Sequence, residues 1–142
     1  IQQQCNKNQK DALINFYKKN NIKNYIFEFE KNIIKLAMSS NLAITRCGAS
    51  TTAELVHTST PFIAIPLPNS IDNHQYLNAK FYEEKGCCWL LKQEDFNTKN
   101  LFDLVMKAIN DKNKLEQVKE NMKKNCNKNV YENIENEIQE FV

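Results

Sequence analysis

The segment AITRCGASTTAEL, residues 43–55, combines residue types that hold a phosphate group. Gly48, one of only two glycines in the chain, stands before four small residues, Ala49, Ser50, Thr51 and Thr52. The pattern predicts a helix over 51–58, whose N-terminus would offer unpaired N–H groups and a partial positive charge. Gly48 would let the backbone turn sharply and let a ligand approach without a Cβ in the way. Because the segment has neither P-loop spacing, nor its lysine, nor G-x-G-x-x-G, we expect a diphosphate held only by N–H groups and by the hydroxyls of Ser50, Thr51 and Thr52.

Glu54 lies in the first turn or so of this predicted helix. Its two carboxylate oxygens suit the two neighbouring hydroxyls of a ribose, which gives it a role in binding. The alternative is that Glu54 only complements the helix dipole and caps backbone N–H groups. The local sequence leaves both interpretations open.

A second polar segment, PLPNSIDNHQYLNA at residues 66–79, follows the next predicted strand. Ser70 or Asp72 can cap a helix there, and His74, Gln75 and Asn78 fall on its first turns. Amide side chains both donate and accept, as the recognition of sugar hydroxyls requires. The alternative is a solvated helix start, and for His74 we favour an exposed or capping role over catalysis.

Short apolar runs alternate with segments of helical periodicity along the chain. We expect strands at 25–29, 42–45, 62–67 and 87–91. We expect helices at 11–20, 32–40, 51–58 and 72–85, the last closed by Gly86, then a helix capped by Thr98 and two more with apolar faces at 115–122 and 131–141. This alternation predicts an α/β fold with a parallel sheet covered on both faces, which binds ligands beyond the carboxyl ends of its strands.

Composition narrows the class of protein. The 142 residues suffice for one domain, and a net charge of +2 does not favour a nucleic-acid partner. The five cysteines include no C-x-x-C pair, which fits a reducing compartment, and neither histidine has cysteines at zinc-ligand spacing. The sequence has no signal peptide and no apolar run of membrane-spanning length. Because residue 1 is Ile and not Met, we expect the chain to be a fragment whose beginning is missing.

Three motifs in order, RCGASTTAEL, PFIAIPLP and DNHQYLNA, closely resemble one family. It is the MurG family, the N-acetylglucosaminyltransferases that make the second lipid intermediate of bacterial peptidoglycan. The resemblance is strong over residues 25–91 and looser in the flanks. It implies the Rossmann-like, donor-binding half of a two-domain GT-B glycosyltransferase. Residues 1–95 would be part of the C-terminal nucleotide-sugar-binding domain, and 96–142 would be the helical C-terminal tail of the same domain.

The resemblance also implies roles for individual residues. Gly48, Ala49, Ser50 and Thr51 would lie along the diphosphate of UDP-N-acetylglucosamine, and Glu54 would hold the ribose hydroxyls. Gln75, with His74 and Asn78, would reach the N-acetylglucosamine ring. Phe29 and Glu30 match the loop whose backbone recognises uracil. Arg46 would support the phosphate loop, with an electrostatic role, and Cys47 stands where the family usually has Ser or Ala.

By the same resemblance the reaction is an inverting, metal-independent hexosyl transfer that needs no cofactor. The acceptor is an undecaprenyl-linked muramyl-pentapeptide, bound through an N-terminal domain that also supplies the general base. No catalytic residue is therefore expected in this chain, which we expect to be inactive alone. The whole protein would be cytoplasmic, peripheral on the cytoplasmic face of the inner membrane.

Two alternatives stay open. The chain could be the donor-binding subunit of another UDP-N-acetylglucosamine-dependent transferase that is split into two chains. It could instead be a non-catalytic nucleotide-sugar-binding or interaction module, which would dock on a partner through the apolar face of residues 131–141.

Overall fold

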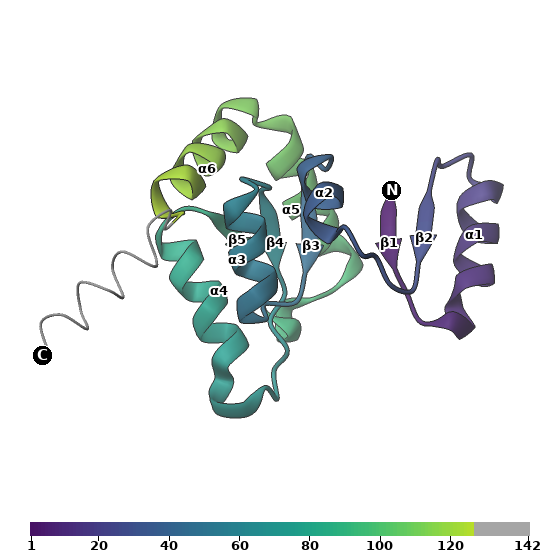
Figure 1. The fold of residues 1–142 in the computed structure, drawn as a ribbon, viewed down its shortest axis with the longest axis horizontal. Coiled ribbons are helices and arrows are strands. Elements are labelled where there is room, and N and C mark those ends of the chain that lie inside the picture. The colour runs from purple at the N-terminus through teal and green to yellow at the C-terminus, as the bar shows by residue number, and fades with distance from the viewer. Residues whose placement is uncertain (127–142) are drawn as a thin grey trace, which may run out of the picture. The chain divides into compact units, whose positions relative to one another are not determined.

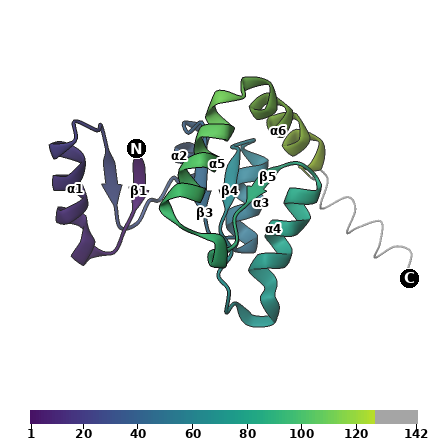
Figure 2. The same ribbon diagram turned by 180° about the vertical axis from the view of Figure 1, so that it is seen from behind.

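The computed structural model describes residues 1–126, which fall into two compact units (Figures 1 and 2). The first unit is Ile1–Ile33, and the second begins at Ile34. The helix predicted at 131–141 lies outside the described residues, and the predicted division of the chain at residue 95 stays a prediction.

The first unit is a parallel pair of strands with a helix against it. It contains β1 (Gln2–Gln4), a 3-10 helix (Lys7–Gln9), α1 (Lys10–Lys19) and β2 (Tyr25–Phe27). Tyr17 on α1 donates a hydrogen bond to Oε1 of Gln3 at 2.6 Å and so fixes the helix to β1. The sequence did not predict β1, because three glutamines carry no apolar alternation.

The second unit is a three-stranded parallel sheet in the order β3-β4-β5. Its strands are β3 (Ala43–Thr45), β4 (Phe62–Ala64) and β5 (Cys88–Leu90). Its helices are α2 (Ile33–Met38, starting at the last residue of the first unit), α3 (Ala49–His57), α4 (His74–Glu84), α5 (Thr98–Asn110) and α6 (Lys112–Asn125), with 3-10 helices at Ile71–Asn73 and Gln93–Asp95. The predicted α/β fold with parallel strands is confirmed.

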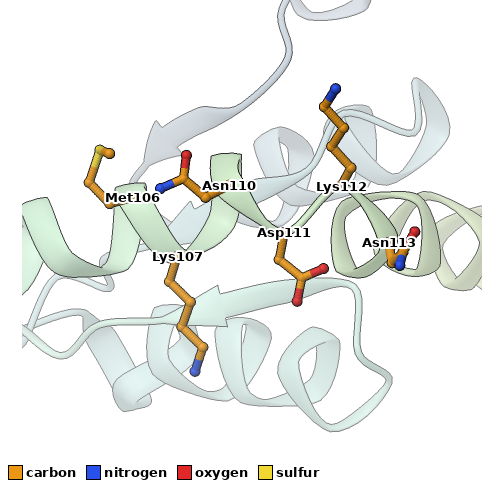
Figure 3. A pocket seen from close by; sticks show the side chains of 6 residues that line it. All are labelled: Met106, Lys107, Asn110, Asp111, Lys112 and Asn113. Carbon is orange, nitrogen blue, oxygen red and sulfur yellow. The ribbon is translucent and has the colours of Figure 1, made fainter.

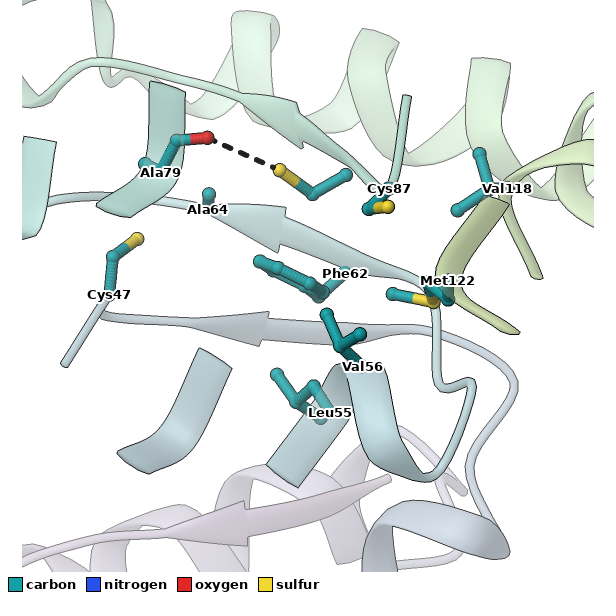
Figure 4. Close-up of a cluster of buried hydrophobic side chains, with 10 residues drawn as sticks. Cys47, Leu55, Val56, Phe62, Ala64, Ala79, Cys87, Val118 and Met122 are labelled. Atoms are coloured by element: carbon teal, nitrogen blue, oxygen red, sulfur yellow. Dashed lines mark hydrogen bonds between the residues drawn. The ribbon is translucent and has the colours of Figure 1, made fainter. Parts of the chain in front are cut away.

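The central strand β4 is buried on both faces because helices cover both sides of this sheet. Phe62 and Ala64 point into a cluster built by α3, α4 and α6, to which Val118 and Met122 contribute (Figure 4). Ile63 points the other way, into a smaller cluster with residues of α5. Alternate residues of β4 thus serve opposite faces, which explains why its sequence is continuously apolar.

Gly86 ends α4 as the sequence predicted. It adopts a left-handed φ of +66°, its N–H donates to Glu83 O, and Cys87 N–H donates to Tyr82 O, each at 2.8 Å. These two bonds form a Schellman motif, which is common where a helix stops at glycine. The turn feeds the chain directly into β5.

Replacing Gly86 with alanine should destabilise the fold. An added Cβ would lie 2.6 Å from Nδ2 of Asn121, which itself donates to Gly86 O at 3.2 Å, and the left-handed φ would be strained. We expect the free energy of unfolding, measured by urea titration, to fall by about 1–3 kcal/mol.

Gly48→Ala is the matched control, since φ at Gly48 is −63° and a Cβ there meets nothing within 4 Å. If the free energy of unfolding fell equally in Gly86→Ala and Gly48→Ala, the assignment of strain to Gly86 would be contradicted.

The cap of α5 differs by one residue from the prediction. Asn97, not Thr98, is the N-cap, and its side chain accepts a hydrogen bond from Asn100 N–H at 2.8 Å. Both residue types cap helices, so composition alone did not decide between neighbours.

Candidate functional site

The N-terminus of α3 lies just beyond the carboxyl end of β3. The helix begins at Ala49, two residues earlier than predicted, and Gly48 is its N-cap. Because φ at Gly48 is ordinary for any residue, the expectation that glycine is needed for a sharp turn is wrong. The space where its Cβ would stand is open, however, so close approach by a ligand remains a prediction.

The hydroxyl residues of this helix start divide into two groups. Ser50 and Thr51 are exposed, whereas Thr52 is fully buried and its hydroxyl donates to the carbonyls of Gly48 and Ala49. The expectation that Thr52 is a ligand donor is therefore wrong. Among residues 1–126, no side chain caps the N-terminus of α3, so its first N–H groups have no capping partner there.

Glu54 lies in the second turn of α3, four residues after Ser50 and therefore on the same face of the helix. It is half-buried, and its carboxylate makes no hydrogen bond or ion pair with any residue among 1–126. A capping role is thus not seen, because the helix starts earlier than predicted and places Glu54 beyond its first turn.

Two amides of α4 hold the loop that leads into α3. Asn78 Nδ2 donates to Cys47 O at 3.1 Å, and Gln75 Oε1 accepts from Cys47 N–H at 3.3 Å. The same Gln75 oxygen accepts from Leu67 N–H at 3.0 Å and so connects the loops after β3 and β4. Gln75 Nε2 has no partner within the described part of the chain, which leaves it available as a donor.

The N-terminus of α4 is capped differently from the prediction. Asn73 is its N-cap with a left-handed φ of +55°, and Asp72, also left-handed, makes no cap bond. Ser70 Oγ accepts from Gln75 N–H at 3.3 Å, so the predicted role of Ser70 as a capping side chain is partly met. His74 is exposed, and its Nδ1 lies 2.7 Å from Ile71 O.

Arg46 follows β3 and reaches the neighbouring loops. Its Nη1 donates hydrogen bonds to Ile65 O at 3.1 Å, Pro66 O at 3.3 Å and Gln93 Oε1 at 2.8 Å. Arg46 thus links its own loop to the loops after β4 and β5, and its predicted role at the phosphate loop stays a prediction. Gln93 was not predicted, because it lies 47 residues away in sequence and no motif marks it.

Phe29 and Glu30 belong to the first unit, in the segment after β2. Phe29 is 76% exposed, and Gln4 Nε2 anchors the preceding carbonyl, Glu28 O, at 3.0 Å. Hydrogen bonds from Asn32 N–H and from the Tyr25 hydroxyl, in that order of importance, lower the pKa of the Glu30 carboxyl. Glu30 therefore fixes the local backbone and is not a free acid.

Two of the hollows on the described part of the second unit differ in their distance from the predicted site residues. The larger, about 620 Å³, lies where α5 meets α6 and is lined by side chains from Met106 to Asn113 (Figure 3). It is at the opposite end of the helices from the loops described above and contains none of the predicted site residues. The smaller, about 390 Å³, lies between the loops after β4 and β5, beside Leu67, Tyr76 and Gln93. Only this smaller hollow adjoins the loops of the predicted site.

Three of the cysteines are buried structural residues. Burial raises the pKa of the Cys47 thiol to about 11, and burial likewise raises the pKa values of Cys87 and Cys88. Cys47 points into the core and not toward the helix N-terminus (Figure 4). No thiolate nucleophile is therefore present at this site near neutral pH.

The thiols should react in two classes with a thiol reagent such as Ellman's reagent at pH 8. Cys5 and Cys126, which are partly exposed, should react promptly in the native chain. Cys47, Cys87 and Cys88 should react about a hundredfold more slowly or only after unfolding, because they are buried and protonated. Prompt reaction of all five thiols in the folded protein would contradict this burial.

Within residues 1–126, no three His, Cys, Asp or Glu side chains gather in a way that could hold a metal ion. Nor does any helix of that region have the length and apolar character needed to cross a membrane.

Comparison with known proteins gives the chain its family. The model of the glycosyltransferase family 28 C-terminal domain matches residues 1–136. The chain belongs to glycosyltransferase family 28. Curated relatives of this family 28 chain are named UDP-N-acetylglucosamine–N-acetylmuramyl-(pentapeptide) pyrophosphoryl-undecaprenol N-acetylglucosamine transferase. The one from Pelagibacter ubique is 39% identical and the one from Rickettsia bellii 36% identical, each over 122 residues.

The family 28 chain spans about a third of these relatives. The alignments cover 86% of the chain and 34% of each relative. The crystal structure of MurG from Acinetobacter baumannii matches with a TM-score of 0.85 at 24% identity, over 99% of this chain and 42% of that one. This likeness shows the fold, a parallel sheet with flanking helices as in one part of that GT-B protein, and it confirms the α/β fold class predicted from the sequence.

Proposed function

We propose that the chain supplies the UDP-N-acetylglucosamine site of an inverting transferase. The enzyme would add N-acetylglucosamine to the undecaprenyl-diphosphate-linked muramyl-pentapeptide in peptidoglycan synthesis. The names of the family 28 relatives support this activity. The observation that carries the proposal is the uncapped N-terminus of α3 with open space at Gly48, next to an unpaired Glu54 carboxylate.

The proposed roles follow the chemistry of each group. The N–H groups of Ala49, Ser50 and Thr51 and the two exposed hydroxyls bind the diphosphate, since helix N-termini attract anions. Glu54 accepts from the ribose hydroxyls. Gln75 donates through Nε2 to an oxygen of the sugar.

The proposal assigns roles to four further residues. The backbone beside Phe29 and Glu30 binds uracil in this proposal. Asn78 Nδ2 donates one of its two hydrogens to Cys47 O, so its second N–H and its oxygen act on the sugar. His74 lies at the solvent-exposed start of α4 and borders the sugar.

The transfer is a direct displacement. An acceptor hydroxyl attacks the anomeric carbon, the bond from that carbon to the UDP oxygen breaks, and a base outside these 142 residues takes the hydroxyl proton. Negative charge grows on the departing diphosphate, where the fixed N–H dipoles of α3 stabilise it. The chain itself provides donor binding and leaving-group stabilisation, and we propose that it does not turn over alone.

The contacts with the lipid acceptor and with the membrane belong to the rest of the protein in this proposal. We propose that the lipid acceptor binds to a part outside these residues, and that the whole protein associates peripherally with the cytoplasmic face of the inner membrane. These proposals follow from the chemistry of an undecaprenyl-linked acceptor, which is itself held in a bilayer.

Replacing Gly48 with alanine tests the diphosphate site. We expect unchanged stability and an affinity for UDP, measured by isothermal titration or NMR titration, that falls about tenfold, because the new methyl occupies space that the ligand needs. His57→Ala is the control, since His57 is exposed at the other end of α3. UDP binding that is equal in all three proteins, or absent from wild type, would refute the proposed site.

A further inference from the structure

The guanidinium of Arg46 connects the carboxyl ends of all three strands of the second unit. Arg46 itself follows β3, its two carbonyl acceptors follow β4, and Gln93 lies three residues after the end of β5. The bond to Gln93 is the shortest of the three at 2.8 Å, and it is the only one made to a side chain. Gln93 therefore holds the guanidinium from the β5 side.

Every acceptor around Arg46 is neutral. No carboxylate within residues 1–126 forms an ion pair with Arg46, and the nearby Glu94 is paired with Lys92 at 3.4 Å instead. The positive charge of Arg46 is consequently retained three residues before the first residue of α3. A charge at this position adds to the partial positive charge of the helix N-terminus.

We propose that Gln93 is a positioning residue, which fixes the Arg46 guanidinium beside the diphosphate end of the site without neutralising it. An alanine here would leave the guanidinium only its two backbone carbonyls. A glutamate would hold it as firmly but would cancel its charge, because a carboxylate accepts the same bond and carries the opposite sign. The identity of the ligand rests on the proposed function.

The first test compares ligands with and without phosphate. Gln93→Ala should lower the affinity for UDP about threefold to tenfold, and Gln93→Glu should lower it at least as much, while both leave binding of uridine unchanged. Gln117→Ala, which removes an exposed glutamine from α6, should behave as wild type. An unchanged UDP affinity in Gln93→Ala, or an equal loss for uridine, would overturn the proposal.

The second test needs no ligand. In NMR spectra of the ¹⁵N-labelled chain, the Arg46 guanidinium should show restricted rotation in wild type and Gln93→Glu, and faster rotation in Gln93→Ala, where only the carbonyls of Ile65 and Pro66 remain as acceptors. If Gln93→Ala leaves the rotation restricted, Gln93 does not position Arg46, whatever the chain binds. If wild type does not bind UDP but this rotation changes as expected, the proposed function fails while the positioning role stands.

Discussion

Replacing Glu54 with alanine is expected to lower the affinity for UDP by roughly 30- to 100-fold, because a carboxylate that accepts from two ribose hydroxyls contributes about 2–3 kcal/mol. The fold should be unaffected, since no residue among those described pairs with this carboxylate. Isothermal titration gives the affinity, and urea unfolding checks the stability.

A ligand without the ribose 2′-hydroxyl sharpens this experiment. Wild type should bind 2′-deoxy-UDP more weakly than UDP, whereas Glu54→Ala should bind both equally, so that the two losses do not add. Glu116→Ala removes an exposed glutamate from α6 and serves as the control. If Glu54→Ala still distinguishes the two nucleotides as wild type does, Glu54 does not contact the ribose.

Gln75 has two roles that substitutions should separate. Its oxygen holds the loops beside α3, and its Nε2 donates to the sugar in the proposed site. Gln75→Ala leaves the N–H groups of Cys47 and Leu67 without their acceptor, so we expect the free energy of unfolding to fall by about 1–3 kcal/mol. The loops beside α3 would lose their connection at the same time. The affinity for UDP-N-acetylglucosamine should then fall by about 100-fold, because a donor bond and the positioning of the loops are lost together.

Gln75→Glu keeps the acceptor oxygens and removes only the Nε2 donor. Its stability at pH 7 should stay within about 1 kcal/mol of wild type, because a carboxylate accepts from both N–H groups. Binding of UDP-N-acetylglucosamine should weaken about tenfold more than binding of UDP, because only the former carries the sugar. Equal losses for both ligands in Gln75→Glu would show that Gln75 acts on the loops alone.

The sequence predicted the elements of this fold better than their ends. Buried apolar runs and the glycine at residue 86 carry their structural reason within a few residues, so β4, β5 and the end of α4 were found, although β4 ends at Ala64 and not at residue 67. β1 was missed because its three glutamines are held by pairing with β2, a partner distant in sequence. The start of α3 was displaced by two residues because Ala49 and Ser50 are as compatible with a loop as with a first helical turn.

The site was predictable as a set of residues and less so as a set of contacts. The family motif marked Gln75 and Asn78, but their bonds to the backbone of Cys47 depend on how α4 packs beside α3. The prediction for Thr52 was wrong because the sequence does not show whether a threonine hydroxyl faces a ligand or donates to a carbonyl of its own helix. Gln93 carried no signal, since its side chain meets Arg46 from another loop, 47 residues away in sequence.

The two hydrogen bonds from α4 to the backbone of Cys47 affect which residues this position can accept. Both of its main-chain polar atoms are taken by α4, and its sulfur is enclosed with no exposed surface. These two bonds depend on backbone atoms that every residue except proline possesses. Substitution at residue 47 is therefore limited by the volume of the surrounding core, which accommodates a thiol.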